Sequence, residues 1–133
     1  MLKLLSILAL SIALHELGHF IAAKLFKQKI LSVQLFLFPI LYIFVKGTLL
    51  KIGLIPVIGY VNAPVNNLKP IQKIIYFSSG ILVNTLLLLI PDPFVRAVNL
   101  YKIIFSLIPY GNSDGKNILI VLKSCLHLCK PKK

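Results

Sequence analysis

The first 26 residues most constrain what this chain can fold into, because they form a nearly continuous apolar run that carries a polar pentapeptide. No proline interrupts residues 4–26. A run of this length can cross a bilayer, which needs about 20 residues as a helix. His15-Glu16-Leu17-Gly18-His19 lies inside it. A carboxylate near the bilayer centre costs about 2.5–3.5 kcal/mol on insertion scales. Because a residue with such a cost is usually kept for its function, the pattern predicts a spanning helix that bears a reaction site.

The start of this run also resembles a secretory signal peptide, with Ala9-Leu10-Ser11 as the cleavage site. The helical pattern continues for more than a turn beyond the pentapeptide, and Lys24, Lys27 and Lys29 anchor its far end. These features favour a retained helix over a cleaved leader.

Composition indicates a membrane protein. The 133 residues are 58% hydrophobic, with a mean hydropathy of +0.92 and a net charge of +12. The basic residues lie in loops and at the tail, between apolar segments, so anionic lipid explains them better than nucleic acid does. The positive-inside rule places the N-terminus outside, with Lys3, Arg96 and Lys102, and places residues 27–73 and the C-terminus in the cytosol. We therefore expect a multi-pass protein of the bacterial plasma membrane.

Residues 30–66 differ from a spanning helix. Ile30 to Val45 is rich in β-branched and aromatic residues and contains Pro39. Lys46-Gly47 then interrupts the apolar sequence, and a second apolar run, Leu54 to Val61, follows. Short apolar runs bounded by Gly, Pro and Lys favour strands. The sequence predicts a membrane-associated β-hairpin or small sheet here, and a strongly apolar hairpin span over 30–45 is the alternative.

Two more spanning helices are predicted after this region. Residues 71–90 form the second, which Pro91-Asp92-Pro93 ends. Residues 94–128 form the third, but Pro109 to Gly115 is turn sequence in its middle. Irregular backbone at membrane depth occurs only where it is buried in protein or lines a wet cavity, so the interruption indicates a site. The fold class is therefore an α-helical integral membrane protein with about three spanning helices and a small hairpin between the first two.

The pentapeptide has the spacing of a zinc site. His15 and His19 are four residues apart and share one helical face, so both imidazoles can reach one zinc ion. Glu16 would then stand beside the ion as general base, where an aspartate would be about a methylene too short. The alternative is a chance pentapeptide whose histidines only pack.

A catalytic zinc needs a third protein ligand and an open position for water. The candidates are His127, Asp92 and Asp114. His127 lies near the basic tail, and Asp92 lies between two prolines on the outer loop. Asp114 lies in the interrupted helix and is our choice, although it could simply cap the helix that starts near Gly115.

The two cysteines, Cys125 and Cys129, flank His127 in a Cys-x-His-x-Cys arrangement. This cluster could bind a metal, but it offers three ligands and matches no strong zinc spacing. Two free thiols at a cytosolic helix end are the favoured interpretation.

Four short segments, in this order and with fitting intervals, extend the pattern beyond the pentapeptide. They are Leu14-His15-Glu16-Leu17-Gly18-His19-Phe20, Ile58-Gly59-Tyr60-Val61, Ser79-Gly80-Ile81-Leu82-Val83-Asn84, and Ser106-Leu107-Ile108-Pro109 continuing to Asp114-Gly115.

Together these segments resemble the site-2 protease family of intramembrane zinc metalloproteases, peptidase family M50, over nearly the whole chain. The resemblance implies one zinc ion per chain, held by His15, His19 and Asp114, with Glu16 activating water. It also implies hydrolysis of peptide bonds in or near transmembrane segments of membrane-embedded substrates. The chain departs from the family pattern at Ser106 (usually asparagine), Ile81 (proline), Ile58 (glycine) and Asn112-Ser113.

The resemblance raises further expectations about substrate handling and regulation. A helical substrate must unwind, and a β-edge within 30–62 could capture it as an added strand. Asn84 could bond that strand or a neighbouring helix. The interval of about 45 residues between the first two helices is too short for a PDZ-type domain, so we expect one membrane-embedded domain over 1–133, regulated by a partner or by substrate supply. The rival functions are an inactive membrane scaffold or chaperone, and a metal transporter or sensor, for which no polar path is visible.

Overall fold

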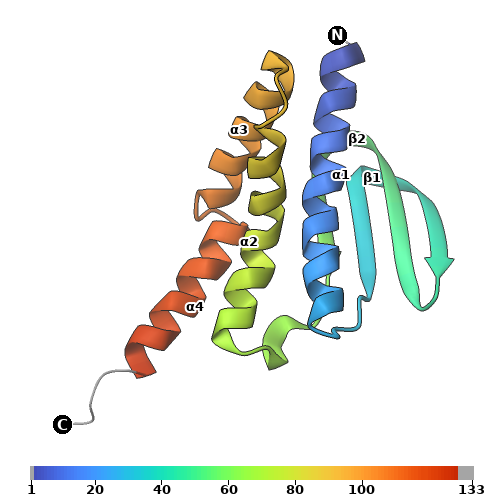
Figure 1. The fold of residues 1–133 in the computed structure, drawn as a ribbon. Coiled ribbons are helices and arrows are strands. Elements are labelled where there is room, and N and C mark those ends of the chain that lie inside the picture. Colours follow the sequence, from blue (N-terminus) through green and yellow to red (C-terminus); the bar gives the residue numbers. More distant parts are fainter. Residues whose placement is uncertain (1, 129–133) are drawn as a thin grey trace.

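The structure is a computed structural model that describes residues 2–128, with side-chain surroundings given up to Leu126. Within this range the chain forms four α-helices and one two-stranded antiparallel sheet (Figure 1). This confirms a mostly helical protein with a small hairpin between its first two helices. The elements in order are α1 (Leu2–Leu25), β1 (Ser32–Val45), β2 (Thr48–Asn62), the short 3-10 helix η1 (Val65–Asn67), α2 (Pro70–Leu87), α3 (Pro93–Leu107) and α4 (Asp114–Leu128).

Helix α1 is the one helix in residues 2–128 that is long and apolar enough to cross a membrane, judged by length and composition. Its 24 residues reach about 36 Å, which exceeds the hydrocarbon core of a bilayer. Helix α2 has 18 residues, and α3 and α4 have 15 each. The expectation of three spanning helices therefore stays a prediction.

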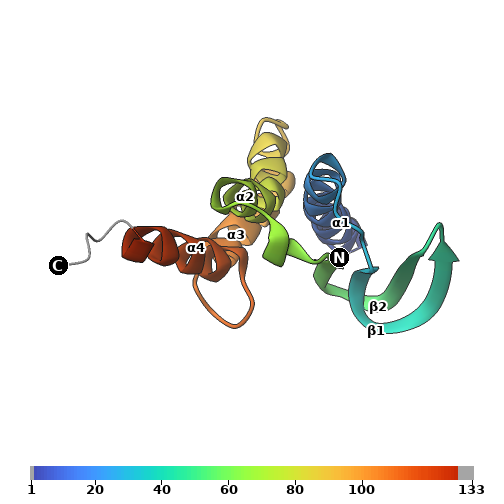
Figure 2. The same ribbon diagram turned by 90° about the horizontal axis from the view of Figure 1, so that it is seen from below.

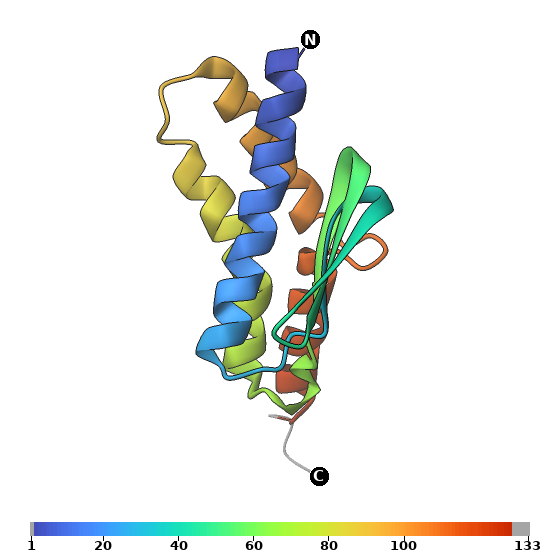
Figure 3. The ribbon, with the colours of Figure 1, turned by 90° about the vertical axis from the view of Figure 1, so that its right-hand side faces the viewer.

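The predicted third helix over 94–128 is two separate helices, α3 and α4, which follow one another along the bundle (Figure 3). Pro109 causes the separation, because it has no N–H for a helical hydrogen bond and it moves the preceding residue out of helical geometry. Ile108 accordingly has extended backbone, with φ −63° and ψ 124°. Gly111, with φ +54°, turns the chain towards α4.

The hairpin is closed by a two-residue turn at Lys46 and Gly47, which have φ values of 48° and 81°. Positive φ at both positions is the type I′ pattern, which suits the twist of a hairpin. Pairing then becomes irregular between Leu35 and Leu41, where Phe36 and Phe38 also have positive φ. The hairpin bends back on itself here. As a result Ser32–Leu35 pairs with residues 59–62 and also with residues 49–52.

Helix α1 lies at the centre of the packing. It contacts α2 and α3 on one side and the hairpin on the other, so that the hairpin and α4 lie on opposite sides of it (Figure 2). Gly18 lets α1 and α2 approach closely, since a Cβ there would be 2.7 Å from the Ser79 carbonyl oxygen. Between α1 and α3 the buried hydroxyl of Ser11 donates to Oδ1 of Asn99 at 2.8 Å.

The start of α1 and the turn between α2 and α3 lie at the same end of the molecule (Figure 1). Lys3 Nζ and Asp92 Oδ2 are 3.0 Å apart there. The expectation that both segments lie on one side of the membrane stays a prediction. Which side is cytosolic remains a prediction. Large apolar side chains are exposed on the helices and on the projecting end of the hairpin, including Leu10, Leu82, Phe105 and Phe44.

Candidate metal centre

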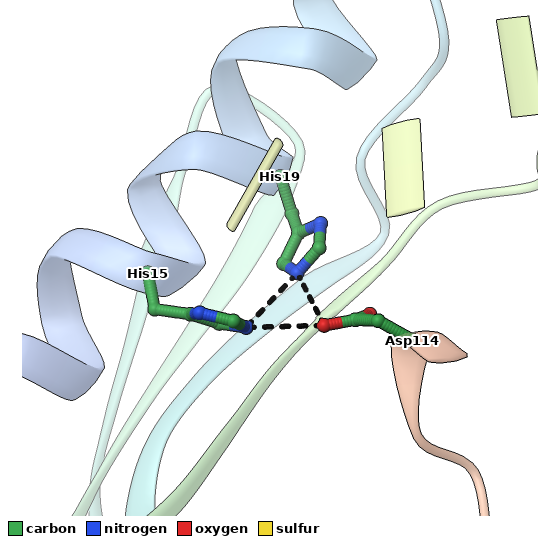
Figure 4. Close-up of side chains that lie close together, drawn as sticks. All are labelled: His15, His19 and Asp114. Atoms are coloured by element: carbon green, nitrogen blue, oxygen red, sulfur yellow. Dashed lines mark hydrogen bonds and ion pairs between the residues drawn. The ribbon is translucent and has the colours of Figure 1, made fainter. Parts of the chain in front are cut away.

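His15 and His19 lie one turn apart on α1 and point their imidazoles to the same side (Figure 4). Both side chains are buried, with residue exposures of 4% and 5%. Their Nε2 atoms are 3.3 Å apart. The four-residue spacing therefore brings the two imidazoles together, as helical geometry predicts.

Asp114, the first residue of α4, completes the cluster (Figure 4). Its Oδ2 lies 3.2 Å from Nε2 of His15 and 3.4 Å from Nε2 of His19. The break after α3 places it there. In this break the Ser113 hydroxyl donates to the Ile108 carbonyl oxygen at 2.6 Å and tightens the turn. The interruption between α3 and α4 thus brings the Asp114 carboxylate next to His15, although the two residues are 99 positions apart in the sequence.

The spacing of the three atoms fits a zinc ion. Zinc bonds nitrogen and oxygen ligands at about 2.0–2.2 Å, and ligand atoms at tetrahedral corners are then about 3.3–3.6 Å apart. The observed separations are 3.3, 3.2 and 3.4 Å. Three corners would be filled by protein, which leaves the fourth open for water or substrate, as in catalytic zinc sites.

Hydrogen bonding at the far side of His19 supports a cation at this point. Nδ1 of His19 lies 2.9 Å from the Tyr76 carbonyl oxygen and 3.2 Å from the Ser79 hydroxyl, which itself donates to that carbonyl at 2.6 Å. Because a carbonyl only accepts, the proton of neutral His19 is on Nδ1, and Nε2 presents a lone pair. That lone pair faces Asp114 Oδ2 and His15 Nε2. A proton on His15 can satisfy one of these contacts, whereas a bound cation satisfies all three.

Helix α2 forms the wall behind the two imidazoles at Gly80. A Cβ on Gly80 would lie 2.6 Å from Nε2 of His15 and 2.6 Å from Nε2 of His19. Any larger residue would therefore occupy the position of the metal-binding atoms. The side chain of Asn84, one turn further along α2, is fully buried, and both its polar atoms have no hydrogen-bond partner in the part of the chain that the structure describes.

Glu16 lies beside the cluster on the next position of α1 and is 5% exposed. Within residues 2–128 its carboxylate makes no hydrogen bond or ion pair, so it is available for proton transfer. The β2 strand passes over it at Gly59, where a Cβ would lie 2.7 Å from Cγ of Glu16. Glu16 also borders a smaller apolar cavity of about 200 Å³ between α1 and the hairpin.

A cavity of about 910 Å³ adjoins the cluster. Its size is near the upper end of the range for ligand pockets. The end of β2 (residues 57–62), the cavity-facing side of α3 and the α3–α4 turn line it, together with His15, Glu16, His19 and Asp114. A peptide could thus reach the open position of the metal centre and Glu16 together.

Of the other candidate ligands, Asp92 lies away from the cluster. Asp92 caps α3, because its Oδ1 accepts from the backbone N–H groups of Phe94 and Val95 at 2.9 and 3.1 Å. The side chain of His127 and the whole of Cys129 lie outside the described residues, so the favoured pair of free thiols and the alternative Cys-x-His-x-Cys metal site both stay predictions. Cys125 is on α4 and is partly exposed.

Lys102 and Tyr76 border the cavity although the sequence interpretation gave neither a place in the site. The charge count grouped Lys102 with Lys3 and Arg96 outside the membrane. The structure places Lys102 within α3, facing the cavity, and the side of the membrane to which it belongs stays a prediction. The sequence did contain a signal for this placement. Lys102 lies in the middle of an apolar segment, four residues before Ser106, and charged residues in such segments usually have a function.

Comparison with known families gives a match between residues 3–95 and the model of peptidase family M50. The matched region contains α1, the hairpin, α2 and the first residues of α3. Asp114 lies beyond it, so its assignment depends on the geometry described above. No curated protein matches the sequence.

Proposed function

Because the chain belongs to peptidase family M50, whose members are zinc metalloproteases, we propose that it is an intramembrane zinc endopeptidase. Its reaction would be the hydrolysis of peptide bonds in or near the transmembrane segments of membrane-bound substrates. The observation that carries this proposal is the arrangement of His15, His19 and Asp114, whose three ligand atoms all lie within 4.8 Å of one another, beside the unpartnered carboxylate of Glu16.

Each residue of the site has a separate role in the proposed reaction. His15, His19 and Asp114 would hold one zinc ion, which when bound lowers the pKa of water and polarises the substrate carbonyl. Glu16 accepts a proton from the attacking water and transfers it to the nitrogen of the leaving amine. The Tyr76 carbonyl holds His19 in the tautomer that keeps Nε2 free for the metal.

The β2 strand offers a means of presenting the substrate. Residues 57–62 line the cavity, and Gly59 lies against Glu16. A substrate segment unwound from its helix could add to this part of the hairpin as a strand, which would bring its backbone to the metal centre. Proline substitutions along residues 57–62 that left cleavage intact would contradict this mode of capture.

The proposed setting is the bilayer itself. The family is membrane-associated, and α1 is apolar and long enough to cross. We place the protein in the plasma membrane as a multi-pass protein with its C-terminus in the cytosol. Its partners there would be a membrane-embedded substrate, lipid and a regulatory membrane protein. A protease-protection assay on a C-terminal tag in sealed vesicles tests this orientation.

The test of catalysis is Glu16→Gln in the full chain, purified in detergent. We expect about one zinc per chain in both proteins and a loss of cleavage of about 10²–10⁴-fold in the variant. Asp92→Asn removes a carboxylate far from the centre and is the matched control. Asp114→Ala is expected to lose the metal as well as activity.

A Glu16→Gln protein that keeps its full biological effect would identify a membrane scaffold instead of an enzyme. Wild-type protein without zinc after purification in metal-replete buffer would contradict the metal centre directly.

A further inference from the structure

The cavity beside the metal centre contains a single lysine or arginine among its lining residues, Lys102 of α3. It lies one turn before Ser106, which lines the same cavity, and three residues after Asn99, which is bonded to Ser11 of α1. Lys102 is therefore on the face of α3 that is turned towards α1 and the reaction site. It is partly buried, in contrast with the exposed lysines of the loops.

The ammonium group of Lys102 has no partner in the described part of the chain. No carboxylate lies within 4.0 Å of it, and it donates no hydrogen bond there. Nevertheless Glu16 and Asp114 are near enough to interact with it electrostatically. A charged side chain in an apolar segment is costly unless it is paired, so an unpaired lysine facing a cavity indicates a missing anion.

The two nearby carboxylates cannot supply that anion once the centre is loaded. Asp114 would be bound to the metal, and Glu16 must stay available for proton transfer. The charges of these two carboxylates balance those of one divalent ion. The charge of Lys102 is then left without compensation, so it favours entry of a negatively charged group into an otherwise neutral and aromatic cavity.

We propose that Lys102 binds a carboxylate of the substrate peptide and so gives this chain a preference for anionic peptides. The carboxylate can be an acidic side chain near the cleaved bond or the C-terminus of a short peptide. This inference rests on the proposed peptidase function for its consequence, but the binding site it describes can be tested without catalysis.

The test uses three fluorescent apolar peptides that differ only in their carboxylates. The first has one central glutamate and an amidated C-terminus, the second has glutamine and a free C-terminus, and the third has glutamine and an amide. Their binding to the full-length Glu16→Gln protein in detergent is measured by fluorescence anisotropy. We expect one carboxylate peptide to bind at least about tenfold more tightly than the neutral one. The peptide that does so identifies the source of the carboxylate.

The preference is expected to disappear when Lys102→Met is added to Glu16→Gln. It should persist with Lys102→Arg, which keeps the charge, and with Lys123→Met, which removes an exposed lysine outside the cavity. Equal binding of all three peptides would overturn the proposal, and so would a preference that survives Lys102→Met.

Cleavage by the protein with Glu16 intact separates this proposal from the peptidase function. Lys102→Met should raise KM for the carboxylate peptide and leave kcat unchanged, because the contact is equally strong in the bound substrate and in the transition state. An equal fall in kcat for all three peptides would instead indicate a structural or transition-state role and overturn the inference. If wild type cleaves none of them while the binding preference holds, the peptidase proposal fails and the Lys102 site stands.

Discussion

Gly80 of α2 lies directly against His19 of α1: a Cβ on this glycine would stand 2.6 Å from Nε2 of the histidine. It would be equally close to Nε2 of His15. The helix backbone thus forms the wall of the proposed metal centre, and the absence of a side chain keeps the space between the imidazoles and Asp114 open. In this chain α2 shapes the site without contributing a ligand.

Gly80→Ala should therefore empty the metal centre. The added methyl cannot move away, because it is attached to helix backbone, so the imidazoles must turn out of position. We expect zinc well below one per chain, measured by elemental analysis of purified protein, and a parallel loss of cleavage. Leu82→Ala, at a position 61% exposed on the same helix, is the control and should keep its zinc. A fully loaded Gly80→Ala protein would show that the centre lies elsewhere.

Gly59→Ala should separate catalysis from metal binding. Its Cβ would meet Cγ of Glu16 at 2.7 Å and Oε1 at 3.1 Å, and the three atoms nearest to it all belong to Glu16. We expect zinc content near one per chain with kcat lowered by about 10²-fold, as for a displaced general base. Leu54→Ala, on the exposed part of β2, should retain activity. Loss of zinc in Gly59→Ala would contradict this division of roles.

Ser79→Ala should weaken zinc binding modestly. It removes the hydroxyl 3.2 Å from Nδ1 of His19 but leaves the Tyr76 carbonyl in place. Loss of such an outer hydrogen bond lowers metal affinity by about tenfold or somewhat more. Competition with a chelator of known affinity measures the change. Ser78→Ala is the matched control, because Ser78 makes no side-chain hydrogen bond within the described residues.

Ser11→Ala should destabilise the contact between α1 and α3. The change leaves Oδ1 of the buried Asn99 without its donor at 2.8 Å, at a cost of about 1–3 kcal/mol in the free energy of unfolding. Replacing both partners, in Ser11→Ala/Asn99→Leu, should restore much of this loss. Ser6→Ala removes an exposed hydroxyl bonded within its own helix and should change little. Detergent titration monitored by circular dichroism compares the four proteins.

Asp92 should make stability depend on pH at the loop end of the molecule. The Lys3 ammonium and the backbone N–H groups of Val95 and Phe94 hold the pKa of Asp92 below its ordinary value of 3.8. Since the folded-state pKa is the lower one, the stabilisation is complete above the ordinary pKa and is lost as pH falls through the folded-state value. We expect Asp92→Ala to lower the unfolding temperature at pH 7 and to differ less from wild type near pH 3. If the difference in unfolding temperature between Asp92→Ala and wild type were the same at both pH values, the ion pair and the helix cap would not be the source of the stabilisation.

Sequence periodicity and turn chemistry predicted much of the fold. The first helix, expected over 4–26, is Leu2–Leu25, and the second, expected over 71–90, is Pro70–Leu87. The hairpin follows from β-branched sequence around Lys46-Gly47. The interruption at Pro109 was also foreseen, because proline and glycine act through the local backbone. The curled register of β1 was not predicted, since it depends on the pairing of Ser32–Leu35 with two separate parts of β2.

For the site, the sequence predicted which three side chains would meet, and the structure brings His15, His19 and Asp114 together. Their role as zinc ligands is the proposal that the variants above test. The placement of Lys102 could not be read from local sequence, because it depends on how α3 is rotated against α1. The Ser11–Asn99 bond fixes that rotation, and it joins residues 88 positions apart.

The order in which the cluster's members occur along the chain has a consequence for biosynthesis. His15 and His19 leave the ribosome long before Asp114, which begins α4. A nascent chain that lacks α4 has only two of the three clustered side chains, His15 and His19. Such a chain cannot hold the metal in the arrangement described here. The proposed metal centre is therefore completed only once α4 has been synthesised.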